Sequence, residues 1–280
     1  MTTTRAQCAG GGTQSAGIVA GGAEPPPGSI NSETYNGSTW TEAANLNTAK
    51  KLQVGTGSGP QSSAISIAGL AAALVNETET WNGTSWTETA NVNTARSQAG
   101  GGGSSNTSAM VFGGQSAPPD WSSGATETWN GTSWTEVGDL NTPRTQITGG
   151  GPVTSAIGIG GYVPAPGSTD KTETWDATSW TEVADLNTPR QSGMGLVTSN
   201  TLATVGGGVS NPGDTPTVNT ESWNGTSWTE VANLATARYS ATGVGKATLG
   251  FVAGGGTSAS GGTATEEWTQ ALTAKTVTVS

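Results

Sequence analysis

The stretch TETWNGTSWTEVGDLNTPR, residues 126–144, occurs three times in the chain with few changes. It returns as TETWDATSWTEVADLNTPR at residues 172–190 and as TESWNGTSWTEVANLATAR at residues 220–238. Each copy holds two tryptophans, acidic residues beside them and a basic residue at its end. Similarity at a fixed period indicates that one supersecondary unit is stacked many times, so this repeat decides the fold.

Weaker copies extend the repeat over the whole chain. The second tryptophans are spaced by 46, 48, 46 and 48 residues, which gives six units in 280 residues. The repeat aromatics are Tyr35, Trp40, Trp81, Trp86, Trp129, Trp134, Trp175, Trp180, Trp223, Trp228 and Trp268. The repeat bases are Arg5, Lys50, Arg96, Arg144, Arg190 and Arg238. The units run approximately over residues 5–49, 50–95, 96–143, 144–189, 190–237 and 238–280.

Each unit is predicted to form four short antiparallel strands. A glycine-rich strand follows the base, and an apolar strand closed by glycines comes next, as in SAMVFGG. The segments TETW and SWTEVA alternate like half-buried strands, and the Asn-Gly between them favours the positive φ of a tight hairpin. One such sheet cannot bury both faces alone. We therefore predict an all-β fold, a six-bladed β-propeller in a single domain over residues 1–280, with the aromatic pairs between blades.

The order of a glycine pair, a Tyr or Trp, a second Trp and NTPR resembles the kelch repeat. The near-verbatim ETWNGTSWTEV is similar to kelch-like proteins of marine bacteriophages. The resemblance covers essentially the whole chain and implies a kelch-type propeller. Three features depart from it. Unit two has Gly69-Leu70 in place of the double glycine, and unit six has no second Trp. The first unit has no spare strand, so we expect sheet packing to close the ring, with residues 275–279 as the last outer strand.

Composition argues against several functions. The net charge of −10 would repel nucleic acid. The sequence has no apolar run long enough to span a bilayer and no signal-peptide layout, so we expect neither membrane insertion nor export by the ordinary secretory route. The chain has no His and one Cys, Cys8, which we interpret as a small buried hydrophobe. Without a His base or ligand we predict no enzyme activity, no cofactor and no metal site.

The charged residues follow the repeat. One set of acids precedes the first aromatic: Glu33, Glu79, Glu127, Glu173 and Glu221. A second set follows the second Trp: Glu42, Glu88, Glu136, Glu182 and Glu230. A residue that is required once per blade belongs to the scaffold. We therefore predict that each repeat Arg pairs with a repeat Glu and fixes how the fourth strand leads into the next blade.

The connections between second and third strands vary most and emerge on one face of a propeller. They hold the acids outside the repeat, which are Glu24, Glu77, Asp120, Asp170 and Asp214, and the aromatics Trp121 and Tyr162. Variable loops on a rigid frame usually carry recognition. We predict a binding face formed by Trp121, Asp120, Tyr162, Asp170, Asp214 and Glu24, with Trp121 stacked on a sugar or anchoring a protein. The alternatives are that Trp121 folds back over its own loop, and that the acids are solvated or bind Ca²⁺.

Three functions suit such a platform. The phage resemblance implies a non-enzymatic virion surface protein, in a capsid decoration or a tail appendage. Its partners are then other virion proteins or host-surface glycans within a multi-subunit assembly. The second is a secreted or cell-surface bacterial glycan-binding module. The third is a glycan-active enzyme that uses loop carboxylates such as Asp120 and Asp170.

Overall fold

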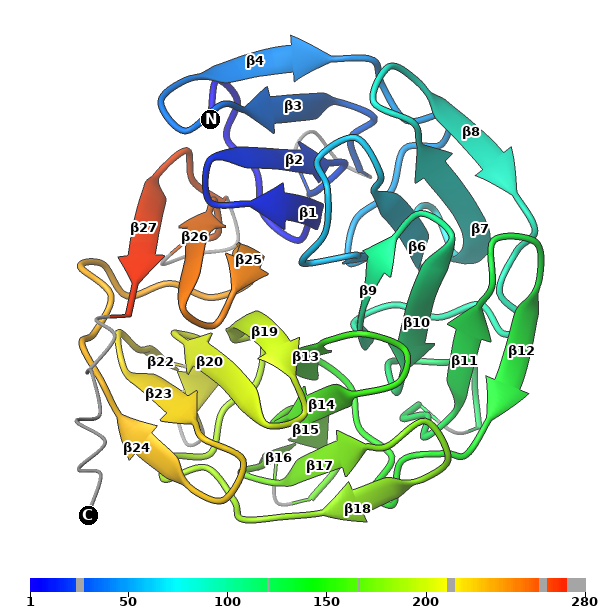
Figure 1. The fold of residues 1–280 in the computed structure, drawn as a ribbon. Coiled ribbons are helices and arrows are strands. Elements are labelled where there is room, and N and C mark those ends of the chain that lie inside the picture. The colour runs from blue at the N-terminus through cyan, green and yellow to red at the C-terminus, as the bar shows by residue number, and fades with distance from the viewer. Residues whose placement is uncertain (24–27, 120, 166, 211–214, 257–260, 271–280) are drawn as a thin grey trace, which may run out of the picture.

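The computed structural model describes residues 1–23, 28–119, 121–165, 167–210, 215–256 and 261–270. Six antiparallel sheets surround a central axis (Figure 1). The described residues form strands and no helix. The prediction of an all-β, six-bladed propeller is confirmed, because each sheet comes from one sequence repeat and lies as one blade of the disc.

Blades 1 to 3 each have four strands, which run from the axis to the rim in chain order. Blade 1 consists of β1 (Ala9–Thr13), β2 (Ala16–Ala20), β3 (Ser32–Tyr35) and β4 (Trp40–Ala43). Blade 2 consists of β5 (Val54–Gly55), β6 (Ile65–Leu70), β7 (Leu74–Trp81) and β8 (Trp86–Thr89). Blade 3 consists of β9 (Gly100–Ser105), β10 (Ser108–Phe112), β11 (Thr126–Trp129) and β12 (Trp134–Val137).

Blades 4 and 5 add a short ribbon to the four-stranded sheet. Blade 4 consists of β13 (Thr148–Gly150), β14 (Ala156–Ile159), β17 (Thr172–Trp175) and β18 (Trp180–Glu182), with β15 (Tyr162–Val163) paired to β16 (Gly167–Ser168). Blade 5 consists of β19 (Met194–Ser199), β20 (Leu202–Gly206), β23 (Thr220–Trp223) and β24 (Trp228–Glu230), with β21 (Val209–Ser210) paired to β22 (Thr215–Pro216). In its described part blade 6 has three strands, β25 (Thr242–Lys246), β26 (Leu249–Ala253) and β27 (Thr265–Thr269).

Glycine lets the inner strands of neighbouring blades touch backbone to backbone. A Cβ on Gly55 would lie 2.2 Å from the carbonyl oxygen of Gly10, and a Cβ on Gly243 would lie 2.2 Å from that of Gly195. Real Cβ atoms do not approach a backbone oxygen so closely. The glycine-rich first strand of each unit is therefore a consequence of crowding at the axis.

The hairpins between third and fourth strands pair the two tryptophans directly, as Trp129 does with Trp134. The Asn130 side chain accepts hydrogen bonds from the N–H groups of Thr132 and Ser133, each at 2.9 Å. Gly131 alone takes a positive φ, 93°. The turn is thus a four-residue loop in which Asn orders the backbone through its side chain and Gly supplies the left-handed conformation.

The double glycine links each blade to the next. The N–H of Gly114 donates to the carbonyl oxygen of the next repeat base, Arg144, at 2.9 Å. In blade 2 the equivalent donor is Gly69, which bonds to the Arg96 carbonyl at 2.8 Å, and the residue before it is Ala68 with φ 52°. The assignment of Gly69-Leu70 to this position was therefore wrong by one residue. Ala replaces the first glycine and takes the left-handed conformation itself, which costs about 1–2 kcal/mol for a residue with a Cβ.

Aromatic pairs lie between neighbouring blades. The ring centroids of Trp175 and Trp180 are 5.5 Å apart, and similar pairs join Trp81 to Trp86, Trp129 to Trp134 and Trp223 to Trp228. The Trp180 indole N–H donates to the Thr126 hydroxyl of the preceding blade at 3.0 Å. Each buried indole covers about 150–250 Å². These contacts stabilise a frame whose inner strands carry few side chains.

Blade 1 packs directly on blade 6 to close the ring. The Gly255 N–H donates to the Arg5 carbonyl at 3.1 Å, as the double glycine does at the other interfaces. The Phe251 ring lies 5.2 Å from that of Tyr35, and the Trp40 indole donates to the Thr265 hydroxyl at 3.2 Å. The predicted outer strand at residues 275–279 lies outside the described residues.

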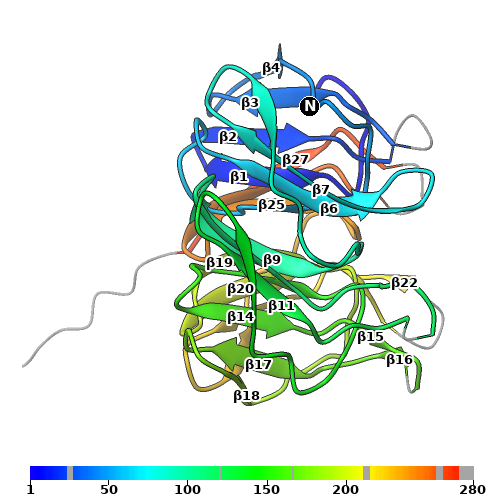
Figure 2. The ribbon, with the colours of Figure 1, turned by 90° about the vertical axis from the view of Figure 1, so that its right-hand side faces the viewer.

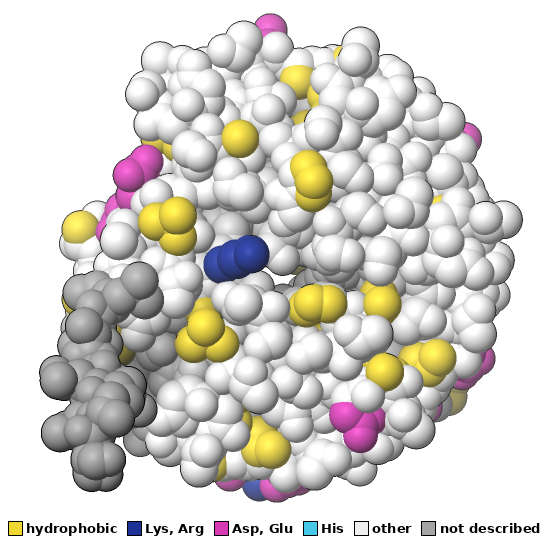
Figure 3. All heavy atoms as spheres, in the orientation of Figure 1, with side chains coloured by type: hydrophobic (Ala, Val, Ile, Leu, Met, Phe, Trp, Pro, Cys, Tyr) yellow, Lys and Arg dark blue, Asp and Glu magenta, His cyan; other side chains and the backbone are white. Residues whose placement is uncertain are grey.

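The two faces of the disc differ in their loops. Figure 2 shows the ribbons of β15, β16 and β22 and the β6–β7 hairpin at one face, which we call the loop face. Turns between first and second strands lie at the opposite face. That opposite face carries scattered apolar side chains and few charges (Figure 3). The variable sequence of the chain is therefore collected on the loop face.

Candidate functional site

Every blade contains an ion pair near the loop face, and the pair is buried in blades 1 to 5 and partly exposed at Glu266 in blade 6. The pairs are Arg5–Glu33 at 2.8 Å, Lys50–Glu79 at 3.6 Å, Arg96–Glu127 at 2.7 Å, Arg144–Glu173 at 2.9 Å, Arg190–Glu221 at 2.6 Å and Arg238–Glu266 at 2.5 Å. Each base pairs with the acid that precedes the first aromatic of its own unit. The acids after the second Trp are exposed instead. The structure thus contains the predicted Arg–Glu pairs and selects one of the two acid sets.

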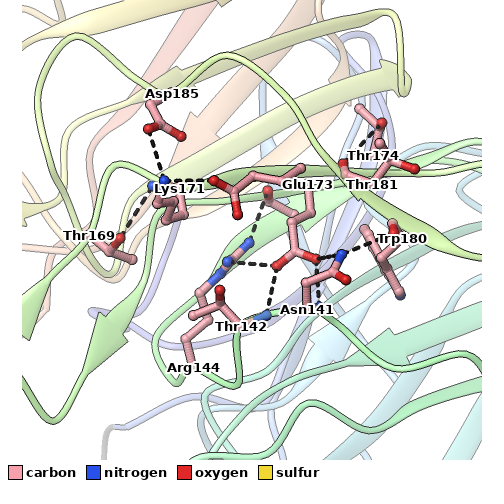
Figure 4. Close-up of polar contacts among 12 residues, drawn as sticks. Asn141, Thr142, Arg144, Thr169, Lys171, Glu173, Thr174, Trp180, Thr181 and Asp185 are labelled. Carbon is pink, nitrogen blue, oxygen red and sulfur yellow. Dashed lines mark hydrogen bonds and ion pairs between the residues drawn. The ribbon is translucent and has the colours of Figure 1, made fainter.

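The pair in blade 4 shows why this arrangement fixes the link between blades (Figure 4). The Glu173 carboxylate accepts hydrogen bonds from the backbone N–H and side-chain amide of Asn141, at 2.7 and 2.8 Å, and from the N–H of Thr142 at 3.3 Å. Asn141 and Thr142 belong to the segment that leaves blade 3. Burial lowers the pKa of the Arg144 guanidinium, whereas the charge of Glu173 opposes that shift. One carboxylate therefore holds the base of its own blade and the chain arriving from the previous blade.

These pairs also determine the charge that a partner meets. Six bases and six acids neutralise one another inside the disc. The four other bases and fourteen other acids of the sequence keep the formal net charge of −10. Lys171 is half-exposed there and bridges Glu182 at 2.6 Å and Asp185 at 3.2 Å. The surface favours neutral or cationic partners over anionic ones.

A narrow channel opens at the centre of the loop face. The six residues that begin the inner strands there have φ between 50° and 61°, and they are Gln7, Leu52, Gln98, Gln146, Ser192 and Ser240. The N–H of Gln98 donates to the Leu52 carbonyl at 3.1 Å, and the same bond joins most neighbours around the axis. The mouth has a volume of about 120 Å³. A second cavity of about 130 Å³ shares Cys8, Ala99 and Ile147 with this mouth and continues the channel along the inner strands.

An open groove on the loop face lies beside Trp121. The connection between β10 and β11, residues 113–125, forms one wall of this groove of about 670 Å³. Asp139 and Pro143 of the segment that leaves blade 3, Pro164 of blade 4 and Thr94 also line it. Trp121 is 58% exposed, the most exposed large apolar side chain in the described part of the chain. Trp121 and Asp139 line the same groove. A ligand in this groove would contact both an aromatic ring and a hydrogen-bond acceptor.

The loop backbone that presents Trp121 is anchored at its C-terminal end. The Ser123 N–H donates to the Gly114 carbonyl at 2.8 Å, and the Gly124 carbonyl accepts from Leu140 at 2.9 Å. These bonds attach the loop to the double glycine of its own blade and to the segment that leads into blade 4. The exposure of Trp121 speaks against the alternative in which this side chain folds back over its loop.

The other predicted binding residues are placed differently. Tyr162 is half-buried in β15, where its N–H and carbonyl bond to Thr145 at 2.7 and 2.9 Å. Asp170 follows β16, and neither residue lines the Trp121 groove. Asp120, Asp214 and Glu24 lie outside the described residues. Of the three described members of the predicted face, Trp121 lines the groove, and Tyr162 and Asp170 do not.

One loop residue was wrongly assigned. Glu77 lies within β7, because the second and third strands of blade 2 continue into a tight hairpin that pairs Leu70 with Leu74. Blade 2 thus has no long variable connection. Sequence reasoning also missed Asp139, Pro143 and Pro164, since Asp139 and Pro143 belong to the repeat and Pro164 to another blade. The only signal for Pro164 was its place in the variable connection of unit four.

The described residues contain no group of three His, Cys, Asp or Glu side chains placed to hold a metal ion. Cys8 lies beside the central channel, and burial raises the pKa of its thiol to about 12. Within the described segments no helix is long and apolar enough to cross a membrane.

Comparisons with known proteins agree on the fold. No family model and no curated protein matches the chain. Many solved structures share the architecture, among them one titled "Structure of YjhT". That structure has a TM-score of 0.77 and 12% sequence identity over 96% of each chain. At this identity the likeness establishes a six-bladed, kelch-type propeller fold and nothing about activity.

Proposed function

We propose that this protein is a non-enzymatic recognition platform that binds a neutral carbohydrate or a protein through the Trp121 groove on the loop face. The observation that carries the proposal is the exposure of Trp121 above a groove of about 670 Å³. An indole face stacks on the C–H face of a sugar, and a Trp in a groove is a frequent anchor in protein interfaces. Asp139 supplies an acceptor for hydroxyl or N–H groups.

The acidic surface supports this choice of ligand. The formal net charge of −10 disfavours sialylated or phosphorylated ligands unless a basic patch receives them. Six of the ten bases are buried in ion pairs and are not available to form such a patch. A neutral glycan or a basic protein surface meets no such repulsion.

A virion surface is the setting that we propose for this platform, on the strength of the sequence resemblance to kelch-like phage proteins. Capsid decorations and tail appendages need a stiff body with replaceable loops, which is what near-identical blades with variable connections provide. Mass spectrometry of purified virus particles tests the setting. Absence of the chain from the particles would favour the second candidate, a secreted or cell-surface glycan-binding module.

The binding test uses a glycan array and a host-cell pull-down with the intact chain and with Trp121→Ala. Leu249→Ala is the matched control, because Leu249 is also an exposed apolar residue and lies at the end of β26. We expect Trp121→Ala to lose binding by about tenfold or more, as truncation of an interface Trp commonly does. Its melting temperature should be unchanged. Equal binding by Trp121→Ala would remove the groove from the proposal.

A further inference from the structure

Two exposed carboxylates of blade 4 hold a lysine ammonium group between them. The Lys171 Nζ donates to Glu182 at 2.6 Å and to Asp185 at 3.2 Å (Figure 4). Lys171 directly precedes β17, Glu182 ends β18, and Asp185 lies in the segment that leaves the blade. The two carboxylates thus form a site for a primary ammonium group, and blade 4 fills this site with a side chain of its own.

Blade 3 has the same two carboxylates but lacks the lysine. WTEVGD in blade 3 aligns with WTEVAD in blade 4, so Glu136 and Asp139 occupy the places of the two carboxylates. The residue before TETW is Ala125 in blade 3 and Lys171 in blade 4. Neither Glu136 nor Asp139 forms an ion pair with a base in the described part of the chain. Blade 3 therefore presents the carboxylates of an ammonium site without an ammonium group of its own.

Backbone hydrogen bonds place the two loops in the same way. The Leu140 N–H donates to the Gly124 carbonyl at 2.9 Å, and the Leu186 N–H donates to the Asp170 carbonyl at the same distance. The residue after each acceptor is Ala125 in blade 3 and the lysine in blade 4. Burial lowers the pKa of the buried arginine in both blades, and the two exposed carboxylates oppose that shift in both. The two sites therefore have the same position relative to the frame of their blades.

The site in blade 3 is part of the Trp121 groove. Asp139 and Ala125 line this groove of about 670 Å³ together with Trp121. Three prolines add apolar surface to its walls, and they are Pro119, Pro143 and Pro164. A ligand that lies over Ala125 reaches both carboxylates, as the lysine of blade 4 does. A lysine side chain suits such a surface, because its stem packs on apolar walls and its ammonium group is attracted by carboxylates and by the face of an indole.

We propose that the Trp121 groove binds a partner polypeptide through a lysine side chain. The ammonium group of that lysine lies between Glu136 and Asp139, as the ammonium group of Lys171 lies between its own two acids. The stem lies over Ala125 and beside the indole. The formal net charge of −10 attracts a basic partner. This inference rests on the proposed function, because it names the class of partner that the same groove receives.

An NMR titration of the ¹⁵N-labelled chain tests the site. The probe is an end-capped glycine peptide with one central lysine, and the control peptide carries acetyl-lysine at the same place. We expect the lysine peptide to shift the Trp121 indole N–H and Ala125 backbone N–H signals saturably. The acetyl-lysine peptide should bind about tenfold more weakly, because it lacks the charge for two exposed ion pairs and a cation–π contact. Absence of saturable shifts, or equal binding of the two peptides, would overturn the inference.

Variants show whether the ammonium group lies between the two carboxylates. Ala125→Lys supplies that group from the chain itself, as blade 4 does, and should abolish peptide binding. Asp139→Asn should weaken binding severalfold, and Asn can keep the bond that Asp139 accepts from the Thr126 N–H at 3.3 Å, as Asn91 does in blade 2. A thermal melt shows that each variant is folded. Peptide affinity that is unchanged in both variants would refute the site.

A matched control tests whether the peptide responds only to the overall charge. Glu42 is exposed in blade 1 at the place that Glu136 takes in blade 3. Glu42→Gln removes the same charge as Glu136→Gln does, but away from the groove. We expect Glu136→Gln to weaken peptide binding severalfold and Glu42→Gln to leave it unchanged. Equal losses in the two variants would show attraction to the net charge alone and would overturn the inference.

The host-cell pull-down separates this inference from the proposed function. If Trp121→Ala abolishes host-cell binding while Ala125→Lys leaves it intact, the groove is retained and the lysine is refuted, which favours a neutral carbohydrate. If both variants abolish host-cell binding and the lysine peptide binds as expected, the inference is supported. Lysine-dependent peptide binding without any effect of Trp121→Ala on host-cell binding would refute the proposed function and retain the ammonium site.

Discussion

The buried ion pair of blade 4 allows the scaffold to be tested quantitatively. Arg144 and Glu173 are both fully buried, and their charged atoms are 2.9 Å apart. Removing one member of a buried pair usually destabilises a protein by about 3–5 kcal/mol, because the remaining charge is left in a medium of low polarity. The two charged groups have different hydrogen-bond partners. This difference predicts which of the two substitutions lowers the free energy of unfolding more.

Arg144→Leu leaves the Glu173 carboxylate with three donors, two from Asn141 and one from Thr142. We expect this variant to cost about 3 kcal/mol, the lower end of the range. Glu173→Leu instead leaves a buried guanidinium whose other contact is the Gly158 carbonyl at 3.4 Å, and it also leaves the donors of Asn141 and Thr142 unpaired. We expect about 5 kcal/mol or more. The acid is thus predicted to matter more than the base.

Thermal and chemical denaturation of the two single variants and the double variant give the free energies of unfolding. For a chain of this size one kcal/mol corresponds to roughly 2–4 °C, so Arg144→Leu should melt about 10 °C lower. Lys171→Ala is the control, because its bridges to Glu182 and Asp185 are exposed, and it should lower the melting temperature far less than Arg144→Leu does. An unchanged melting temperature in Arg144→Leu, or a smaller loss in Glu173→Leu than in Arg144→Leu, would refute the role of the carboxylate as the link between blades.

Three further predictions concern single residues. Burial raises the pKa of the Cys8 thiol to about 12, so alkylation at pH 8 should be slow in the native protein and fast in denaturant; equal rates would contradict the burial. Gln98 has φ 55°, where a β-branched side chain fits worst, so Gln98→Val should lower the free energy of unfolding while Gln98→Gly does not, as denaturant titration will show. Hydrogen bonds to Glu182 and Asp185 raise the pKa of Lys171 from 10.5 to about 12, so its stabilisation is present below pH 10.5 and lost as the pH rises through 12. Melting of the native chain and Lys171→Ala across this range should converge at the alkaline end.

The local sequence pattern predicted most of the architecture. Alternation in TETW and SWTEV defines two strands, Asn and Gly define the turn between them, and six copies at a regular period define the blades. The repeat also identified the aromatics of the blade interfaces and the ion-pair residues. These features can be predicted from the sequence because each recurs in an equivalent environment. The same physical requirement there selects the same residue types.

Features that depend on the ring as a whole could not be predicted from the local sequence pattern. Two acid sets had the same period, and only the folded chain shows that Glu173 and its equivalents meet the bases while the other set faces water. Ala68 takes a position that pattern assigned to its neighbour, because the N–H that must reach Arg96 belongs to Gly69. Contacts between residues about thirty positions apart depend on how neighbouring blades are placed.

The sequence by itself determined the number of blades, their strands and the aromatic packing between them, since these follow from periodicity and side-chain size. Only the tertiary structure shows that Trp121 is exposed and lines a groove together with Asp139 and Pro164. It alone also shows that Thr204, Gly206 and Trp268 line a pocket between blades 5 and 6 of the described residues. Both sites join segments from different blades, and a site of this kind exists only after the ring has placed those segments side by side.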